Sequence, residues 1–210
     1  MLIKISSRQS DLAKLQSYSV GKALQSYNQE LKTEYIFKQS LGDINLIDPL
    51  WKMPEKGVFT EDFVADLLNG NVDLVVHSWK DLPTEPRIRT EIVGTLHRED
   101  VRDLFLFRRD RKSQVQSTKT LRVLTSSPRR SYNLRNFFIE CFPGALAKVE
   151  FESVRGNIPT RMEKLLNQDV DGLIVAKAAL DRLLSSTTDE YREVRNRMRE
   201  VLNQCHFMVL

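Results

Sequence analysis

One short segment, DLVVHSWKDLP at residues 73–83, carries several side chains that could do chemistry together. Its apolar part, residues 74–76, predicts a strand that runs directly into His77, Lys80 and Asp81. In open α/β sheets, groups at the carboxyl end of a strand line the crevice where ligands bind. A lysine beside an aspartate at such an end predicts a site for chemistry or for a charged ligand. The alternative is a solvated ion pair in a turn.

Other predicted strands also end in arginine with hydroxyl or glycine neighbours. The first, residues 2–6, leads into Arg8 and Ser10. Later strand ends read TSSPRR (125–130), VRGNIPTR (154–161) and IVAKAALDR (174–182). A single arginine at a helix start is usually solvated, but hydroxyls, helix N-termini and guanidinium forks together bind anions. Parallel strands end at one edge of their sheet, so we expect these arginines to converge on a cleft for a ligand with several carboxylates or phosphates.

Composition favours an ordinary globular protein. The chain has 210 residues, 41% hydrophobic and 29% charged, with a net charge of +4. No apolar run approaches the ~20 residues of a membrane span, and the start lacks the order of a signal peptide, so a cytoplasmic location is expected. The two cysteines, Cys141 and Cys205, and the scattered histidines predict neither a disulfide framework nor a metal site. Nucleic acid is disfavoured because the cations lie in loops beside Asp81.

The order of elements predicts two α/β lobes. In the first half the pattern is strand, helix, strand, helix, strand, ending at residues 74–76. The same rhythm restarts with strands at 121–125, 147–154 and 172–176, each followed by a helix, and a final helix covers about 188–202. Residues 104–107 are expected to form an extended connection, and residues 108–120 a polar surface loop.

Taken together and in order, the motifs resemble the porphobilinogen deaminase (hydroxymethylbilane synthase) family of tetrapyrrole, and hence haem, biosynthesis. The motifs are SSRQSDLAKLQ (6–16), LGD with DPL (41–50), KGVF (56–59), VHSWKDLP (76–83), HREDVRD (97–103), TSSPRR (125–130), VRGNIPTR (154–161) and AKAALDRL (176–183). They span nearly the whole chain. The combination of VHSxKDxP, TSSxRR and RGNxxTR is highly specific.

The resemblance implies an α/β fold of two lobes like the periplasmic binding proteins, with helix-flanked mixed sheets. The expected lobes are residues 1–97, with the catalytic aspartate, and residues 98–203, rich in anion-binding arginines. Residues 204–210 are expected to start a strand that returns to the first lobe and is cut short. The family's third domain is expected to be absent from this chain.

The resemblance also implies an activity, the stepwise condensation of four porphobilinogen units with release of ammonia. The growing chain is held on a covalent dipyrromethane cofactor, and no metal is implied. By matched position Asp81 is the catalytic carboxylate, which hydrogen-bonds pyrrole N–H groups. The implied cofactor-binding residues are Arg8, Ser10, Lys80, Ser126, Ser127, Arg129, Arg130, Arg155, Arg161 and Arg182, and the implied substrate-binding residues are Lys52, Lys56 and Phe59. Phe59 could equally be a core residue at a helix start.

Two alternatives of different class stay open, and the first is an enzyme of this family. The family's cofactor cysteine lies in the third domain, and neither Cys141 nor Cys205 matches it, so whether this chain alone is active is open. The second alternative is a non-catalytic, two-lobed protein that binds polypyrroles or other polyanions. The expected partner is porphobilinogen, without nucleic acid or membrane. The family implies a monomer, and a truncated sheet edge would favour self-association.

Overall fold

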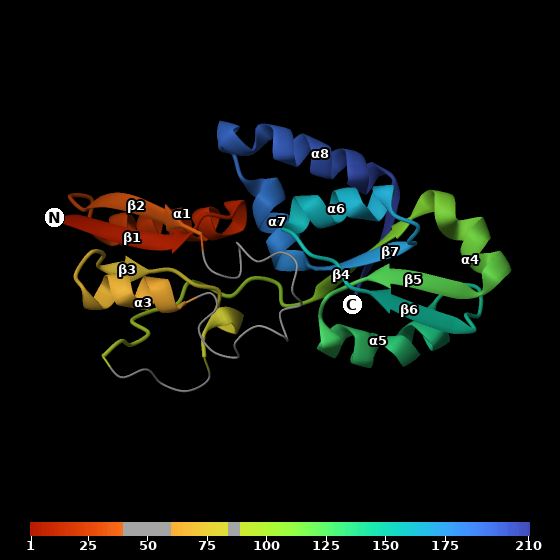
Figure 1. Cartoon of the computed structure of the whole chain (residues 1–210). Coiled ribbons are helices and arrows are strands. Elements are labelled where there is room, and N and C mark those ends of the chain that lie inside the picture. The colour runs from red at the N-terminus through yellow and green to blue at the C-terminus, as the bar shows by residue number, and fades with distance from the viewer. Residues whose placement is uncertain (40–59, 84–88) are drawn as a thin grey trace. The chain divides into compact units, whose positions relative to one another are not determined.

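The computed structural model describes residues 1–39, 60–83 and 89–210. They divide into two compact units, Met1–His97 and Arg98–Leu210. Each unit contains a β-sheet flanked by helices (Figure 1), which confirms the predicted α/β class.

The first unit is built on a three-stranded parallel sheet with the order β2-β1-β3. Its elements are β1 (Leu2–Arg8), α1 (Asp11–Tyr27), β2 (Lys32–Lys38), α3 (Glu61–Leu68), β3 (Leu74–Val75) and the 3₁₀ turn η2 (Trp79–Asp81). Ile5, at the centre of β1, is fully buried and pairs with Tyr35 and Leu74. A Cβ on Gly21 would lie 2.0 Å from the Tyr35 hydroxyl, so glycine lets α1 lie directly on β2.

The second unit has a five-stranded mixed sheet with the order β6-β5-β7-β4-β8. Its strands are β4 (Asp103–Arg108), β5 (Thr120–Leu124), β6 (Lys148–Glu152), β7 (Gly172–Ala176) and β8 (Cys205–Val209). Its helices are η3 (Arg109–Arg111), α4 (Lys112–Thr118), α5 (Pro128–Cys141), α6 (Ile158–Asn167), α7 (Lys177–Ser185), η4 (Asp189–Tyr191) and α8 (Arg192–Asn203). Strand β5 runs parallel to β6 and β7, whereas β4 runs antiparallel to β7 and β8.

Alternation along β4 gives the second sheet two buried faces. Phe105 belongs to a cluster that includes Phe138 of α5 and Ile174 of β7. Leu106, which points to the opposite face because side chains alternate along a strand, is also fully buried. A strand that is buried on both faces has a continuous apolar sequence, as residues 104–107 (LFLF) have here.

Three of the sequence-based expectations are wrong. Residues 108–120, expected to form a surface loop, contain the end of β4, η3 and α4, and Val115 of α4 is buried in the core. Residues 204–210 were expected to start a strand that returns to the first lobe. They instead pair with the free edge of β4, where Phe105 lies opposite Met208 and Phe107 opposite His206. Residues 104–107, expected to be a connection, form the strand between β7 and β8.

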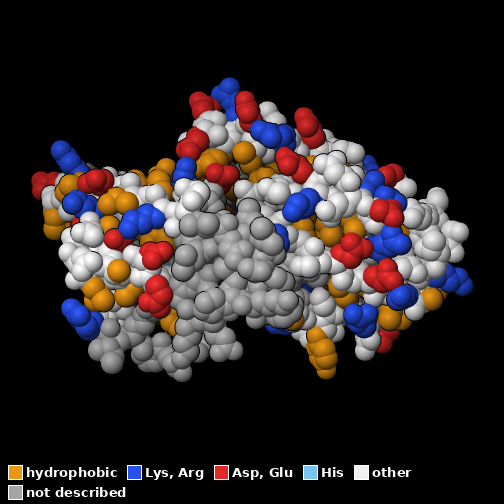
Figure 2. Space-filling model, in the orientation of Figure 1, with side chains coloured by type: hydrophobic (Ala, Val, Ile, Leu, Met, Phe, Trp, Pro, Cys, Tyr) orange, Lys and Arg blue, Asp and Glu red, His pale blue; other side chains and the backbone are white. Residues whose placement is uncertain are grey.

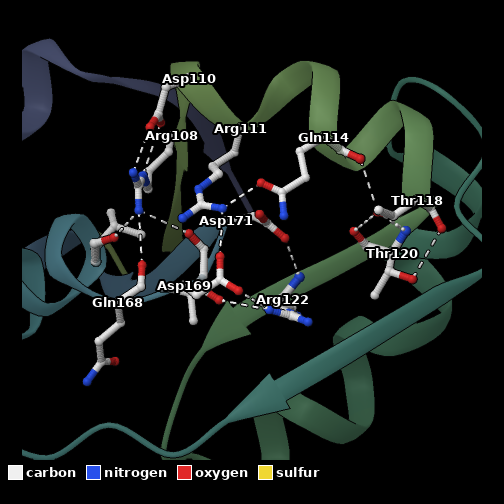
Figure 3. Close-up of polar contacts among 12 residues, drawn as sticks. Arg108, Asp110, Arg111, Gln114, Thr118, Thr120, Arg122, Gln168, Asp169 and Asp171 are labelled. Atoms are coloured by element: carbon white, nitrogen blue, oxygen red, sulfur yellow. Dashed lines mark hydrogen bonds and ion pairs between the residues drawn. The ribbon is translucent and has the colours of Figure 1, made fainter.

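The amino-terminal edge of this second sheet is covered by a network of opposite charges (Figure 3). Asp169 accepts hydrogen bonds from Arg111 at 2.7 Å and from Arg122 at 2.5 Å. The buried Asp171 accepts the backbone N–H of Arg122 at 2.7 Å, and burial raises the pKa of its carboxyl group. A pocket of about 290 Å³ nearby is lined by Arg122, Asp171 and Glu150, among other residues. Acidic and basic side chains here neutralise one another.

Gly172, at the start of β7, provides a test of the packing in the second unit. A Cβ at this position would lie 2.3 Å from Cε2 of Phe105 and 3.0 Å from the carbonyl oxygen of Leu106. We expect Gly172→Ala to lower the free energy of unfolding by about 1–3 kcal/mol, because the ring and the strand must move. Gly94→Ala is the control, because no atom lies within 4 Å of a Cβ there. Urea unfolding that gives equal stability for both variants would contradict this account.

Asp66 provides a pH-dependent test in the first unit. Its buried carboxylate accepts hydrogen bonds from Lys38 and Asn71, and the bond from Lys38 lowers its pKa. The stabilisation is therefore present above the carboxyl's unfolded pKa of about 4 and is lost as the pH falls. We expect Asp66→Asn to cost about 1 kcal/mol at pH 7 and progressively less as the pH falls below about 4. A series of urea unfolding curves from pH 7 downward measures this, and a difference that does not change with pH would contradict it.

Candidate functional site

The first unit places Asp81 beside Arg8 at the carboxyl ends of two neighbouring strands. Arg8 ends β1 and Asp81 lies in η2, just after β3, which runs parallel to β1. Nη1 of Arg8 lies 3.7 Å from Oδ2 of Asp81, and their side chains are 23% and 19% exposed. This is a long ion pair in a partly screened environment, so the carboxylate keeps acceptor positions for a ligand.

The turn that carries Asp81 is fixed to the rest of the first unit. The backbone N–H of Asp81 donates to the carbonyl of Ser78 at 2.9 Å. The Ser78 hydroxyl donates to Oε1 of Gln16 on α1 at 3.1 Å. Gln16 therefore contributes to the position of Asp81, and HSWKD and SDLAKLQ come together although they are far apart in the sequence. Lys80, on the same turn, is exposed.

Of the remaining predicted site residues of the first unit, the structure describes only Ser10. Ser10 is the N-cap residue of α1; its carbonyl accepts the N–H of Lys14 at 3.0 Å, and its hydroxyl makes no capping bond. Lys52, Lys56 and Phe59 lie outside the described residues, so their predicted roles stay predictions.

In the second unit, Ser126 and Ser127 organise the strand ends. The hydroxyl of Ser126 accepts the N–H of Val154 at 2.8 Å and donates to the carbonyl of the same residue. It therefore ties the end of β5 to the end of β6. The Ser127 hydroxyl caps α5 by accepting the N–H of Arg130 at 3.4 Å. Pro128 follows in the first turn, where its missing N–H has no helical partner to lose.

Three of the predicted arginines of the second unit lie close to one another. The Nε of Arg161 donates to the carbonyl of Gly156 at 2.7 Å. Burial, and then the positive charges of Arg130 and Arg155, lower the pKa of Arg161. The positive charges of Arg130 and Arg155 therefore act on Arg161, and an anion bound among the three would relieve this repulsion. We call Arg130, Arg155 and Arg161 the arginine cluster.

Gly156 shapes the loop that carries this arginine cluster. Its φ of 113° lies in the region that favours glycine, and a Cβ there would lie 2.8 Å from Cγ2 of Thr160. Asn157 caps α6 by accepting the N–H of Thr160 at 3.0 Å. The loop therefore reaches the helix start in a fixed conformation.

The carboxylates that pair with the cations at this edge were not predicted from the sequence. Arg130 donates through Nε and Nη2 to Asp103, at 2.8 and 2.5 Å. Arg182, on α7, lies 3.8 Å from Glu99. Both acids belong to HREDVRD (97–103), a family motif for which no role in ion pairing was predicted. Its position directly before an apolar run was the available signal. Arg129, in contrast, is exposed on the first turn of α5.

The part of the chain that is described gives little support to a metal site, a reactive cysteine or a membrane-spanning helix. Residues 1–39, 60–83 and 89–210 contain no group of three or more His, Cys, Asp or Glu side chains that could hold a metal. Burial raises the pKa of Cys205 to about 11, and Cys141 is exposed. No helix among those residues is long and apolar enough to cross a membrane. On the face drawn in Figure 2, acidic and basic side chains are interspersed over the second unit.

Both units therefore present polar and charged groups at the carboxyl edges of their sheets, a partly exposed carboxylate in one and an arginine cluster in the other. Fold and site together define an α/β protein of two units equipped to bind an anionic ligand.

Comparison with known proteins gives the family. The profile of the family described as "Porphobilinogen deaminase, dipyromethane cofactor binding domain" matches residues 3–208. A probable porphobilinogen deaminase of Thermoplasma volcanium is 36% identical over 183 residues, which cover 87% of this chain and 57% of that protein. The porphobilinogen deaminase of Desulfitobacterium hafniense is 35% identical over 181 residues, 86% of this chain and 56% of that protein. The chain belongs to the porphobilinogen deaminase family.

The chain spans less than two thirds of the length of these relatives. Among solved structures, the extracellular-binding protein YtmK of a probable amino-acid ABC transporter from Bacillus subtilis aligns with a TM-score of 0.40 at 11% identity. That alignment covers 97% of this chain and 90% of the solved one.

The arginine cluster predicts stabilisation by anions. We expect sulfate to raise the melting temperature of the wild type, relative to chloride at equal ionic strength, by roughly 2–4 °C more than that of Arg155→Gln. Arg197→Gln is the control, because Arg197 lies on α8 and pairs with Glu163 and Glu193. Equal sulfate responses in the wild type and Arg155→Gln would show that the cluster binds no anion.

Proposed function

We propose that this chain acts as a hydroxymethylbilane synthase, which condenses four porphobilinogen units and releases ammonia at each step. The observation that carries the proposal is the position of Asp81. Its carboxylate lies at the carboxyl edge of the first sheet, 3.7 Å from Arg8 and 19% exposed, in a chain of the porphobilinogen deaminase family. A polyanion-binding protein needs the arginines but has no use for this acid.

The chemistry gives Asp81 a defined role. Loss of the aminomethyl nitrogen of porphobilinogen as ammonia leaves positive charge that is delocalised onto the pyrrole nitrogen. A fixed carboxylate nearby stabilises this charge as it develops, which is electrostatic catalysis. At ~4 Å and an effective dielectric constant near 20 the attraction is about 4 kcal/mol, which corresponds to roughly three orders of magnitude in rate. Asp81 can also accept a proton from the pyrrole or pass one to the leaving amine.

The arginines fit the dipyrromethane group that the family name implies. Burial, and next the positive charges of Arg130 and Arg155, lower the pKa of Arg161, so a negative ligand would be favoured beside it. The acetate and propionate groups of pyrroles carry the complementary charge, and guanidinium groups bind carboxylates in a bidentate manner. When bound, dipyrromethane supplies the primer to which new pyrroles are joined. Residues suited to hold it are Arg8, Ser10, Lys80, Ser127, Arg129, Arg130, Arg155, Arg161 and Arg182, with Ser126 positioning the loops.

Lys52, Lys56 and Phe59 complete the proposal as substrate-binding residues, on the basis of the family motif. The partner in this proposal is porphobilinogen, and the protein is a cytoplasmic monomer, as the family resemblance implies.

Size-exclusion chromatography with light scattering tests the monomer: a single species near 24.4 kDa is expected.

Replacement of Asp81 tests the catalytic role. We expect Asp81→Asn to slow ammonia release from porphobilinogen by about three orders of magnitude while porphobilinogen still binds. The measurements are ammonia release, uroporphyrin after oxidation, and native mass for dipyrromethane that is held without a covalent bond. Asp62→Asn, an exposed position on α3, is the control and should keep wild-type turnover.

Near-wild-type turnover by Asp81→Asn would refute the role of this carboxylate. Binding of porphobilinogen without ammonia release by the wild-type chain would instead support the polyanion-binding alternative. Circular dichroism of each variant separates a loss of chemistry from a loss of fold.

A further inference from the structure

The segment that enters the second unit brings its own carboxylates to the cations at the carboxyl edge of the sheet. Glu99 lies 3.8 Å from Arg182, Asp100 lies 3.7 Å from Lys177, and Asp103 pairs with Arg130. The segment is held there by the backbone, because the N–H of Lys177 donates to the carbonyl of Arg102 at 3.0 Å. All of these contacts lie within Arg98–Leu210.

Two of these carboxylates are firmly held. Asp103 accepts two hydrogen bonds from Arg130, and the side chains are only 22% and 17% exposed. Asp100 accepts the backbone N–H of Arg102 at 3.0 Å and a two-pronged contact from the same guanidinium, which lowers its pKa. Displacement of either acid would break several hydrogen bonds at once.

Glu99 is held much more weakly. Its side chain is 61% exposed, and its contact with Arg182 is a single approach at 3.8 Å, beyond hydrogen-bond distance. Arg182 is only 25% exposed, so a negative partner compensates for the water that its guanidinium has lost. An exposed pair of this geometry contributes little, whereas a ligand carboxylate can make short, charge-assisted bonds to the same guanidinium.

We propose that Glu99 is an internal counter-ion of Arg182 that a ligand carboxylate displaces, and that it thereby determines affinity at this position. Before a ligand binds, Glu99 supplies a counter-charge to Arg182. A ligand must compete with it, so an anion that makes further contacts besides Arg182 has an advantage over one that reaches Arg182 alone. The identity of the ligand as a pyrrole carboxylate rests on the proposed function. The competition itself rests on the geometry of Glu99 and Arg182.

Glu99→Gln tests the competition, with Glu163→Gln as a matched control. Glu163 also lies 3.8 Å from an arginine, Arg197, and its side chain is 47% exposed, but it belongs to α6. Both changes remove one negative charge. Calorimetric titrations use porphobilinogen and, separately, sulfate. We expect Glu99→Gln to tighten binding of each by about two- to fivefold, and Glu163→Gln to leave it unchanged.

The same titrations are repeated in the background of Arg182→Gln. There Glu99→Gln should give no gain, because the competition needs Arg182. Equal affinities for the wild type and Glu99→Gln, a gain that persists without Arg182, or an absence of sulfate binding would each overturn the inference. If sulfate shows the Arg182-dependent gain while porphobilinogen binds to no variant, the inference stands and the proposed function fails.

Discussion

The second unit depends on one electrostatic constraint, the gathering of guanidinium groups at the carboxyl edge of its sheet. Arg161 is partly withdrawn from water next to the charges of Arg130 and Arg155, which lowers its pKa. Such a cluster opposes folding unless carboxylates or backbone carbonyls compensate for it. Asp103 and the carbonyl of Gly156 provide this compensation. The capped starts of α5 and α6 hold the loops that carry the arginines.

The sequence predicted the elements whose signals are local. Helices α5 and α6 follow their strands as expected, and a capping side chain and a proline mark the start of each. The α4 helix was missed because Val115 is its one buried residue among polar neighbours, so no periodic pattern identifies it. Strand β8 was assigned to the wrong sheet because its partner, β4, is selected by tertiary pairing rather than by its own sequence.

The candidate site, too, could be predicted from the sequence only where the signal is local. Residues that follow strands, such as Arg8 and Asp81, could be placed at sheet edges from their position alone, and these two do approach each other. Glu99 and Asp103 could not, because acids in a charged turn look like solvated residues. Their partners are supplied by distant segments, α7 and α5. Gln16 was inside a quoted motif, but its bond to Ser78 depends on the packing of α1 against the loop after β3.

The charge network at the amino-terminal edge of the second sheet affects how a ligand arrives. There Arg111 and Arg122 are matched by Asp169, Asp171 and Glu150, so their fields largely cancel at a distance. At the opposite edge Asp103 and Glu99 pair with Arg130 and Arg182, while burial and the charges of Arg130 and Arg155 lower the pKa of Arg161. A polyanion that approaches this edge therefore meets cations that already have acidic partners nearby. Its attraction to the strand ends is short in range and weakens as salt is added.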